Sequence, residues 1–290
     1  MPSAWMRHVG RAQTALRTAT ARATWPLLSH RRRDSLTDWL LGGSDNRWLF
    51  IIGAGNSGTT LLTRILRLHP AIRDLPWEGA RYTRALHLPG PEGVGRVFTQ
   101  KLDRYRLTEE DDAEPARRVR FDWAWHYPRY PGWLLEKSPV NSVRARWLQA
   151  NFQPARFIVL TRSPYAVCEG IRRRSAHSVE EAATHWAALH DLLEADLPRL
   201  EHVLQLTYER ICEDPRGVVA DLEVFLDLPA PFDPARLDED FSVHNMDGAT
   251  TPIRNFNDKS IGRLRPEERR AVTEIAGAAL RRWGYQPLDD

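Results

Sequence analysis

The chain has 290 residues, of which 42% are hydrophobic and 27% charged, a composition that suits one sizeable α/β domain, with or without an insertion. It holds no run of about 18 apolar residues, so we expect no membrane-spanning helix. The net charge is +3, yet residues 1–33 hold seven arginines and no Asp or Glu, and subtracting these seven leaves −4 for the remainder. The body of the protein is therefore not a basic nucleic-acid-binding domain.

Residues 1–46 are interpreted as a basic, flexible N-terminal extension, and the globular domain is expected to cover 47–290. One alternative for the extension is an Arg-rich amphipathic helix that makes peripheral contact with an acidic membrane surface. Another is a transit peptide, which has a similar composition. The two cysteines, Cys168 and Cys212, fall in helix-like segments, which favours reduced thiols in an intracellular, cytoplasmic protein.

The most informative stretch begins with an apolar run at 48–52, which has the length and β-branching of a buried parallel strand. A glycine-rich turn, Gly53–Gly58, follows, and a helix is predicted over 58–68. A strand, a glycine turn and a helix N-terminus together form an anion cradle. The glycine spacing matches a Walker A loop, but no lysine follows Gly58. A phosphate-type ligand is therefore indicated, and nucleoside triphosphate chemistry is disfavoured.

The rest of the chain alternates strands with helices. Strands are expected at 133–136, 156–161 and 202–207, after a short segment at 71–76, and helices at 140–151, 165–174, 178–197, 215–226 and 266–282. Residues 79–131, with helical stretches near 92–104 and 115–125, are interpreted as an insertion or lid, and 240–264 as a loop. The alternation predicts a three-layer α/β fold in which helices flank a mainly parallel central sheet.

Three of the predicted strands end in polar residues. These are the glycine turn after 48–52, Lys137 with its neighbours after 133–136, and Arg162 after 156–161. In an open parallel sheet, ligands bind beyond the carboxyl ends of the strands. The three groups are therefore expected to converge on one crevice that takes a ligand with two anionic groups.

Lysine is rare in this chain, since only three of the 41 basic residues are lysine: Lys101, Lys137 and Lys259. The chain uses arginine wherever a surface cation is enough. A lysine that departs from this bias is a candidate for a chemical role, because a compact ammonium and a guanidinium fork interact differently with anions. Lys137, at a predicted strand end, is the strongest of the three candidates.

Four motifs resemble those of the PAPS-dependent sulfotransferase family, closest to its carbohydrate and protein-tyrosine branches and bacterial-like. The segment 53–62 is similar to the family's 5′-phosphosulfate loop, and 157–170 to its 3′-phosphate strand and helix. The segment Glu136-Lys137-Ser138-Pro139 and the block 206–226, with Tyr208-Glu209 and Asp214-Pro215, resemble two further family motifs. The resemblance covers about 48–285.

The resemblance implies a P-loop-type α/β fold and transfer of a sulfonate from PAPS (3′-phosphoadenosine 5′-phosphosulfate) to an acceptor hydroxyl or amine, with PAP as the product and without a metal. The acceptor class stays open among a small molecule, a glycan and a lipid, and the oligomeric state is not predicted. The cofactor-binding positions that the resemblance implies are Gly55, Asn56, Ser57, Gly58, Thr59, Thr60, Arg162, Gly170, Tyr208 and Lys259, with Arg254 as an alternative to Lys259.

Two positions depart from the family pattern. Asn56 stands where the family has Lys or Arg, and Gly170 stands where it has a serine that contacts the 3′-phosphate. We expect Lys137 to take over transition-state stabilisation, and one of the arginines 172–174 to replace the serine contact. The two departures leave a catalytically degenerate protein as an alternative, beside a kinase-like P-loop enzyme.

The general base is expected to be Glu78, which lies near the position of the base in some branches of the family. His126 is the rival candidate. It lies in an aromatic run at 123–127, which is interpreted either as core or as the wall of an acceptor pocket. The predicted catalytic set is therefore Lys137, Glu78 and Asn56, with His126 as the alternative base.

Overall fold

The computed structural model describes residues 4–43, 46–127, 129–130, 132–242 and 250–288. Its central sheet has five strands, all parallel, in the order β2-β3-β1-β4-β5. The strands are β1 (Arg47–Ile52), β2 (Ile72–Asp74), β3 (Trp133–Lys137), β4 (Ala155–Thr161) and β5 (Val203–Thr207). The mainly parallel sheet and the α/β class predicted from the sequence are thus confirmed.

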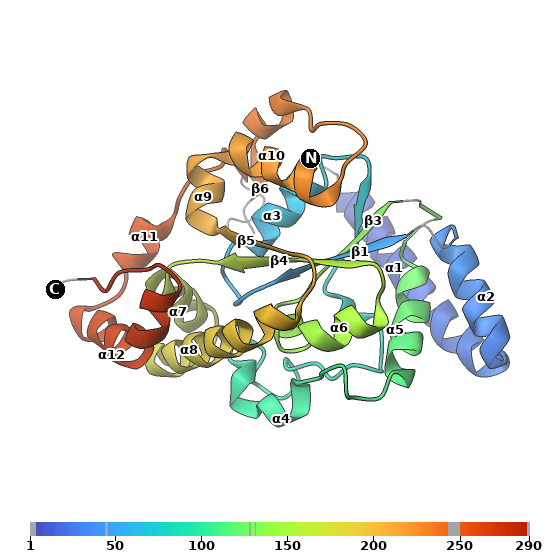
Figure 1. Ribbon diagram of the computed structural model, residues 1–290, viewed down its shortest axis with the longest axis horizontal. Coiled ribbons are helices and arrows are strands. Elements are labelled where there is room, and N and C mark those ends of the chain that lie inside the picture. The colour runs from blue at the N-terminus through green and yellow to red at the C-terminus, as the bar shows by residue number, and fades with distance from the viewer. Residues whose placement is uncertain (1–3, 44–45, 128, 131, 243–249, 289–290) are drawn as a thin grey trace.

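Helices cover both faces of the sheet, which gives three layers (Figure 1). One face carries α3 (Thr59–Leu66), α9 (Tyr208–Glu213) and α10 (Pro215–Leu226). The other carries α5 (Glu114–Ala124), α6 (Ala145–Asn151), α7 (Pro164–Arg174), α8 (Val179–Asp196) and α12 (Pro266–Arg282). Because β1 and β4 are buried on both faces, their sequences are almost continuously apolar instead of alternating.

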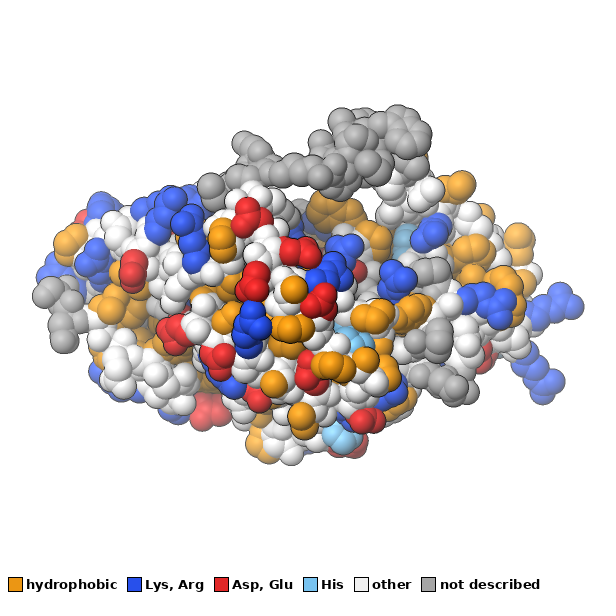
Figure 2. All heavy atoms as spheres, turned by 90° about the horizontal axis from the view of Figure 1, so that it is seen from above, with side chains coloured by type: hydrophobic (Ala, Val, Ile, Leu, Met, Phe, Trp, Pro, Cys, Tyr) orange, Lys and Arg blue, Asp and Glu red, His pale blue; other side chains and the backbone are white. Residues whose placement is uncertain are grey.

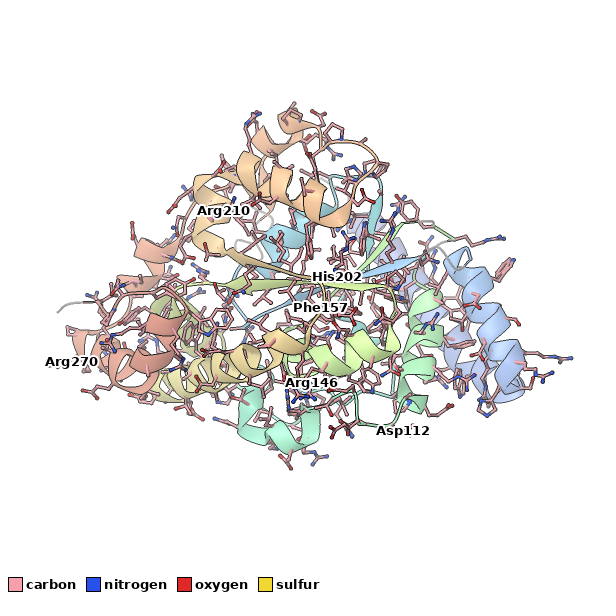
Figure 3. All side chains as sticks on the ribbon, in the orientation of Figure 1. Asp112, Arg146, Phe157, His202, Arg210 and Arg270 are labelled. Carbon is pink, nitrogen blue, oxygen red and sulfur yellow. The ribbon has the colours of Figure 1, made fainter. Side chains whose placement is uncertain are left out.

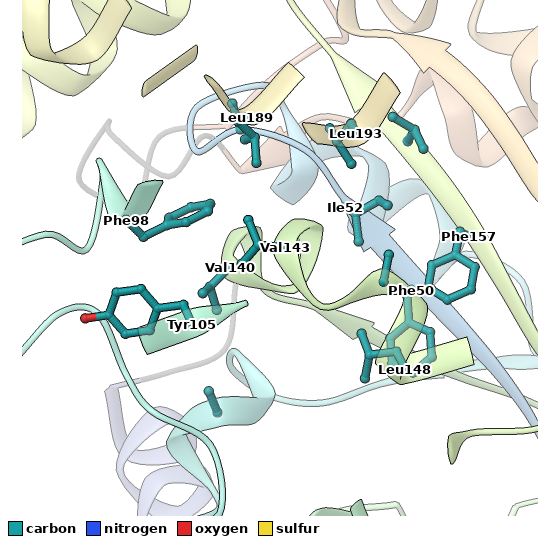
Figure 4. Packing of buried hydrophobic residues seen from close by; sticks show 14 of the residues in the cluster. Phe50, Ile52, Phe98, Tyr105, Val140, Val143, Leu148, Phe157, Leu189 and Leu193 are labelled. Atoms are coloured by element: carbon teal, nitrogen blue, oxygen red, sulfur yellow. The ribbon is translucent and has the colours of Figure 1, made fainter. Parts of the chain in front are cut away.

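Alternate residues of β1 supply the two halves of the core. Phe50 and Ile52 point toward α6 and α8, and Phe50 stacks on Phe157 of β4 with ring centroids 5.4 Å apart (Figure 4). Phe157 lies near the middle of the molecule, on the α6 side of β4 (Figure 3). Leu49 and Ile51 face α3 and α10 on the opposite side. This period of two is that of a pleated strand, and it fixes the register of β1 between β3 and β4.

Besides the expected helix 140–151, which is a 3-10 helix at Pro139–Val143 followed by α6, two expected segments differ in the structure. The stretch 92–104 is irregular up to a 3-10 turn at Phe98–Lys101 and the short helix α4 (Leu102–Tyr105), because closely spaced glycines weaken a helix before residue 98. The expected loop 240–264 contains the two-stranded pair β6 (Phe241–Ser242) and β7 (Thr250–Thr251) and the helix α11 (Asn257–Ile261). Both corrections concern elements too short to show a hydrophobic period.

The N-terminal segment forms two helices, α1 (Ala4–Thr24) and α2 (His30–Leu41). Between them, the Trp25 ring lies edge-on to Phe121 of α5 with centroids 5.0 Å apart. Asp34 of α2 forms an ion pair with Arg117 of α5. Seen from above, arginine and hydrophobic side chains lie side by side at the α2 end of the molecule (Figure 2). Among the described residues, no helix is long and apolar enough to cross a membrane.

Candidate functional site

A cavity of about 420 Å³ opens at the carboxyl edge of the sheet, where the glycine loop, the ends of β3 and β4, and the segment 251–263 meet. Most of the residues predicted for the site lie on its wall. These are Gly55, Asn56, Gly58, Thr59, Thr60, Glu78, Lys137, Arg162, Gly170, Tyr208 and Lys259. The structure therefore brings together the three strand-end groups that the sequence expected in one crevice. Ser57 and His126 do not line the cavity.

The glycine loop is held in a conformation that side chains would prevent. Gly53 has a φ of 144°, and a Cβ there would lie 2.1 Å from the Leu160 carbonyl oxygen. Gly58 has a φ of 91°, and a Cβ there would lie 2.5 Å from the Tyr208 ring. The Gly53 N–H donates to Ser142 Oγ at 2.7 Å, which fixes the start of the loop. Since the first N–H groups of α3 have no partner within the helix, the loop and this helix end together present donors to an anion.

Ser57 is a residue of the loop whose side chain is fully buried. Its Oγ has no hydrogen-bond partner among the residues that the structure describes. A buried hydroxyl without a partner is costly. This residue belongs to the loop but stands behind its cavity-facing surface.

Arg162 extends from the end of β4 across the loop. Its Nη1 donates to the Asn56 carbonyl oxygen at 2.9 Å and its Nε to Asn257 Oδ1 at 2.8 Å. Its guanidinium carbon lies 4.1 Å from the centroid of the Tyr208 ring. Burial lowers the pKa of Arg162, while Tyr208 and Glu209 act in the opposite direction. These contacts fix a planar donor fork at the wall of the cavity, as recognition of a phosphate requires.

Asn56 is the meeting point of several side chains. Its φ of 70° is left-handed, a conformation that Asn adopts more readily than most residues. Its Oδ1 accepts from Arg174 Nη1 at 2.7 Å and from Arg96 Nη1 at 3.4 Å. Burial, followed by the charges of Arg173 and Arg96, lowers the pKa of Arg174 to about 10. The guanidinium groups of Arg96, Arg173 and Arg174 therefore lie close together beside the loop.

The two main catalytic candidates are neighbours. Lys137 Nζ, at the end of β3, lies 3.8 Å from Glu78 Oε1. Glu78 is held through the next residue: the Gly79 N–H donates to Glu136 Oε1 at 2.7 Å, and its carbonyl accepts from Trp123 Nε1 at 2.9 Å. A carboxylate and an ammonium at the same cavity wall are suited to accept a proton and to stabilise developing negative charge, respectively.

Glu136 is a fully buried carboxyl group that belongs to one of the four sequence motifs but was given no role of its own. Besides the Gly79 N–H, it accepts hydrogen bonds from Ser138 and Asn141. Burial raises its pKa to about 7, against the lowering effect of these donors. Through its contacts Glu136 ties the end of β3 to the segment that carries Glu78.

His126 lies outside the cavity wall, in the layer between α5 and the N-terminal helices. Its ring is tilted over Tyr82 with centroids 4.1 Å apart, and its Nε2 lies 3.3 Å from Thr18 Oγ1. Burial lowers its pKa to about 4. The neighbouring aromatic residues Trp123 and Tyr127 belong to the hydrophobic core, and none of the run 123–127 lines the cavity. This run therefore fits the interpretation as core better than that as an acceptor pocket.

The comparison with known families decides the class of the protein. The profile described as "Sulfotransferase family" matches residues 49–234, more than half of the chain. The chain belongs to the sulfotransferase family. The resemblance drawn from the four sequence motifs is thereby confirmed at the level of the family. No curated protein matches the sequence significantly.

Solved sulfotransferase structures share the fold. The chain is similar to the sulfotransferase domain of the Synechococcus PCC 7002 olefin synthase, at 23% identity and a TM-score of 0.55, over 84% of this chain and 96% of that one. It is also similar to sulfotransferase STF9 from Mycobacterium avium, at 17% identity and a TM-score of 0.53, over 89% of this chain and 81% of that one. At these identities the likeness shows the family's P-loop-like fold alone.

Two cations at the cavity, Arg96 and Arg263, were not predicted from the sequence. The clearest is Arg96, which comes from the irregular part of 79–131 and reaches the glycine loop. No local signal marks it, because the chain holds many arginines and the path of this segment depends on tertiary contacts. The full set of charged side chains on the wall is Arg96, Lys137, Arg162, Arg173, Arg174, Arg254, Lys259 and Arg263, with Glu78 as the one carboxylate among the described lining residues.

Proposed function

We propose that this member of the sulfotransferase family transfers a sulfonate from PAPS to a hydroxyl or amine of an acceptor. The observation that carries the proposal is the charge of the cavity: eight cationic side chains and one carboxylate surround a glycine loop and a helix N-terminus. Such a site attracts a ligand with more than one anionic group. PAPS and PAP each carry a phosphate at both ends of the ribose.

Buried polar atoms at the site support this ligand. Arg162 Nη2 and Asn56 Nδ2 are buried, and neither has a hydrogen-bond partner among the described residues. Both are donors, and buried donors without partners are costly. A site with surplus donors fits an anionic ligand. In the proposed complex the loop N–H groups, Thr59 and Thr60 hold the 5′ end, and Arg162 with Arg174 holds the 3′-phosphate.

The chemistry divides between two side chains. When bound, PAPS supplies a sulfonate whose sulfur–oxygen bond to the 5′-phosphate breaks as the bond to the acceptor oxygen or nitrogen forms. Lys137 places a compact positive charge where the leaving phosphate oxygen gains negative charge. Glu78, whose Oε1 lies 3.8 Å from Lys137 Nζ, accepts the acceptor's proton. Asn56 carries no charge and serves the loop as a hydrogen-bonding group.

The segment that precedes β3 is proposed to select the acceptor. This segment, 79–131, follows Glu78 directly and supplies Arg96 to the cavity wall. An acceptor that gives its proton to Glu78 would therefore lie beside it. A small molecule, a glycan or a lipid are the acceptor classes under this proposal. Arg254 and Lys259, which also line the cavity, are proposed to close the donor side.

Thermal unfolding with PAP and, separately, with ATP and Mg²⁺ tests the proposal. A ligand at 100 times its dissociation constant stabilises the folded state by about 2.7 kcal/mol. We expect this shift with PAP and little shift with ATP and Mg²⁺. A shift with ATP and Mg²⁺ alone would contradict the proposal and favour a kinase-like enzyme. Binding of PAP without release of PAP from PAPS would instead indicate a degenerate site.

A further inference from the structure

Position 56 of the glycine loop carries no charge, yet two guanidinium groups lie directly on its side chain. Arg174 is the last residue of α7, and its Nη1 donates to Asn56 Oδ1 at 2.7 Å. Arg96 comes from 79–131, the acceptor-side segment, and its Nη1 donates to the same oxygen at 3.4 Å. The carboxamide is thus the acceptor that holds two cations from distant parts of the chain at the loop.

The surroundings of Asn56 disfavour a cation at this position. Its carboxamide rests against Gly170, where a Cβ would lie 3.0 Å from Asn56 Cγ. A lysine or arginine at position 56 would point its charge toward Arg96 and Arg174, and like charges at such separations repel. The positive charge beside the loop is therefore already present, carried by neighbours of a neutral residue.

The two arginines reach the cavity from different parts of the chain, Arg174 from α7 and Arg96 from 79–131. Arg96 and Glu78 both line the cavity, and the charges of Glu78 and Arg173 act on the Arg96 guanidinium. Burial is the largest influence on its pKa and lowers it, while Glu78 raises it. Among the charges that act on Arg174, those of Arg173 and Arg96 are the strongest, followed by Glu169 and Arg162. Arg96 therefore lines the same cavity as Glu78 and Lys137, beside the loop residue that carries no charge.

We propose that Arg96 provides, from the acceptor-side segment 79–131, the positive charge at the 5′-phosphosulfate that the glycine loop lacks at Asn56. This inference rests on the proposed function and adds a specific residue to it. Its consequence is that the donor site is complete only when the segment that contacts the acceptor is in place. Donor binding and the position of this segment are then linked.

The first test uses binding alone. Affinities of the unmodified protein and of Arg96→Gln are measured by calorimetry for PAP, for adenosine 3′-phosphate, which lacks the 5′-phosphate, and for adenosine 5′-phosphate, which lacks the 3′-phosphate. We expect Arg96→Gln to reduce the preference for PAP over adenosine 3′-phosphate by roughly 10-fold. The preference for PAP over adenosine 5′-phosphate should not change. Arg84→Gln is the matched control, since Arg84 is an exposed arginine of the same segment outside the cavity wall.

The second test measures release of PAP from PAPS with water as the acceptor, which needs no knowledge of the natural acceptor. We expect Arg96→Gln to slow this release by roughly 10²- to 10³-fold. Adding Asn56→Arg to Arg96→Gln should recover at least a tenth of the lost rate, because the new cation then meets one guanidinium fewer. Asn56→Arg alone should give no gain.

The outcomes separate the two proposals. If the unmodified protein neither binds PAP nor releases it from PAPS, the proposed function and this inference both fail. If it does both, but Arg96→Gln keeps the ligand preferences and the rate of the unmodified protein, only the inference fails. A variant in which both ligand preferences fall equally would also overturn it, since Arg96 would then have no particular relation to the 5′ end.

Discussion

The side chain of Asn56 occupies the space beside Gly170 that a side chain at residue 170 would need. A Cβ at this glycine would lie 3.0 Å from Asn56 Cγ and 3.1 Å from Asn56 Cβ, both closer than ordinary van der Waals contact. Asn56 cannot readily move away, because Arg174 and Arg96 hold its Oδ1. Asn56 and Gly170, the two positions that depart from the family pattern, are therefore coupled: the absence of a side chain at Gly170 leaves the space that the Asn56 side chain fills.

This relationship predicts that the effect of Gly170→Ala changes sign with residue 56. In the unmodified protein the extra methyl group should lower the free energy of unfolding by about 1 kcal/mol, because overpacking outweighs the helical preference for alanine. In an Asn56→Gly background the obstacle is gone, and Gly170→Ala should raise the same free energy by up to about 1 kcal/mol. Urea denaturation of the four proteins gives the coupling. Equal effects of Gly170→Ala in both backgrounds would contradict it.

Lys137→Ala should slow release of PAP from PAPS by roughly 10²- to 10³-fold, because it removes the charge that stabilises the leaving phosphate. The fold should remain intact, since Lys137 lies at the end of β3 with its side chain at the cavity wall. Lys101→Ala is the matched control: Lys101 pairs with Glu92 at 3.3 Å, outside the cavity wall. The mechanism is wrong if the two variants turn over equally fast while circular dichroism shows both folded.

Glu136 makes stability depend on pH. Burial raises its pKa from 4.5 to about 7, so between these values the folded state binds more protons than the unfolded state. The contribution of Glu136 to the free energy of unfolding should therefore be fully present below about pH 4.5. It should fall as the pH rises toward 7 and level off above it, with a loss of up to about 3 kcal/mol. Urea denaturation from pH 5 to 8 measures this loss.

The control for this prediction is Glu136→Gln, which keeps an oxygen acceptor for the Gly79 N–H but cannot ionise. The variant should lack the part of the pH dependence that Glu136 contributes. Other buried carboxyl groups, such as Asp74 and Asp122, also have raised pKa values, so the difference between the two proteins is the informative quantity. Identical pH profiles would show that Glu136 is ionised to the same extent in both states.

The parts of the fold that could be predicted are those that depend on residues adjacent in the sequence. The apolar run 48–52 and the glycines after it specify a buried strand and a tight turn, and the structure has both. Ser178 and Glu181 form a capping box at the start of α8, where a helix was expected. The two-residue strands β6 and β7, which pair with each other, are too short to show a period.

The site was predicted less completely for the same reason. Residues that follow strand ends, such as Lys137 and Arg162, reach the cavity because parallel strands share one carboxyl edge. Arg96 reaches it through an irregular segment whose path is set by tertiary contacts. His126 was a reasonable base by residue type, but its buried place beside Tyr82 depends on how α5 meets the N-terminal helices. Residue type and spacing thus identify strand-end groups and not side chains brought in by loops.

Trp25 should be the residue that holds the N-terminal helices to the domain. Its ring meets Phe121 edge-on at 5.0 Å, and the guanidinium carbons of Arg33 and Arg118 lie 4.2 and 4.7 Å from its centroid. Trp25→Ala removes an aromatic pair and two cation–π contacts, so we expect a loss of about 2 kcal/mol in the free energy of unfolding of the helical pair. Amide hydrogen exchange in α1 and α2 should become faster, while exchange in the central sheet should not change.

Trp39→Ala is the matched control, because Trp39 lies on α2 but is 55% exposed, and its loss should change exchange far less. Affinity for PAP should be the same in both variants, since neither tryptophan lines the cavity. Unchanged exchange in Trp25→Ala would mean that other contacts, such as the Asp34–Arg117 ion pair, hold the helices in place. Exposed ion pairs contribute about 1 kcal/mol or less, so the aromatic contact is expected to dominate.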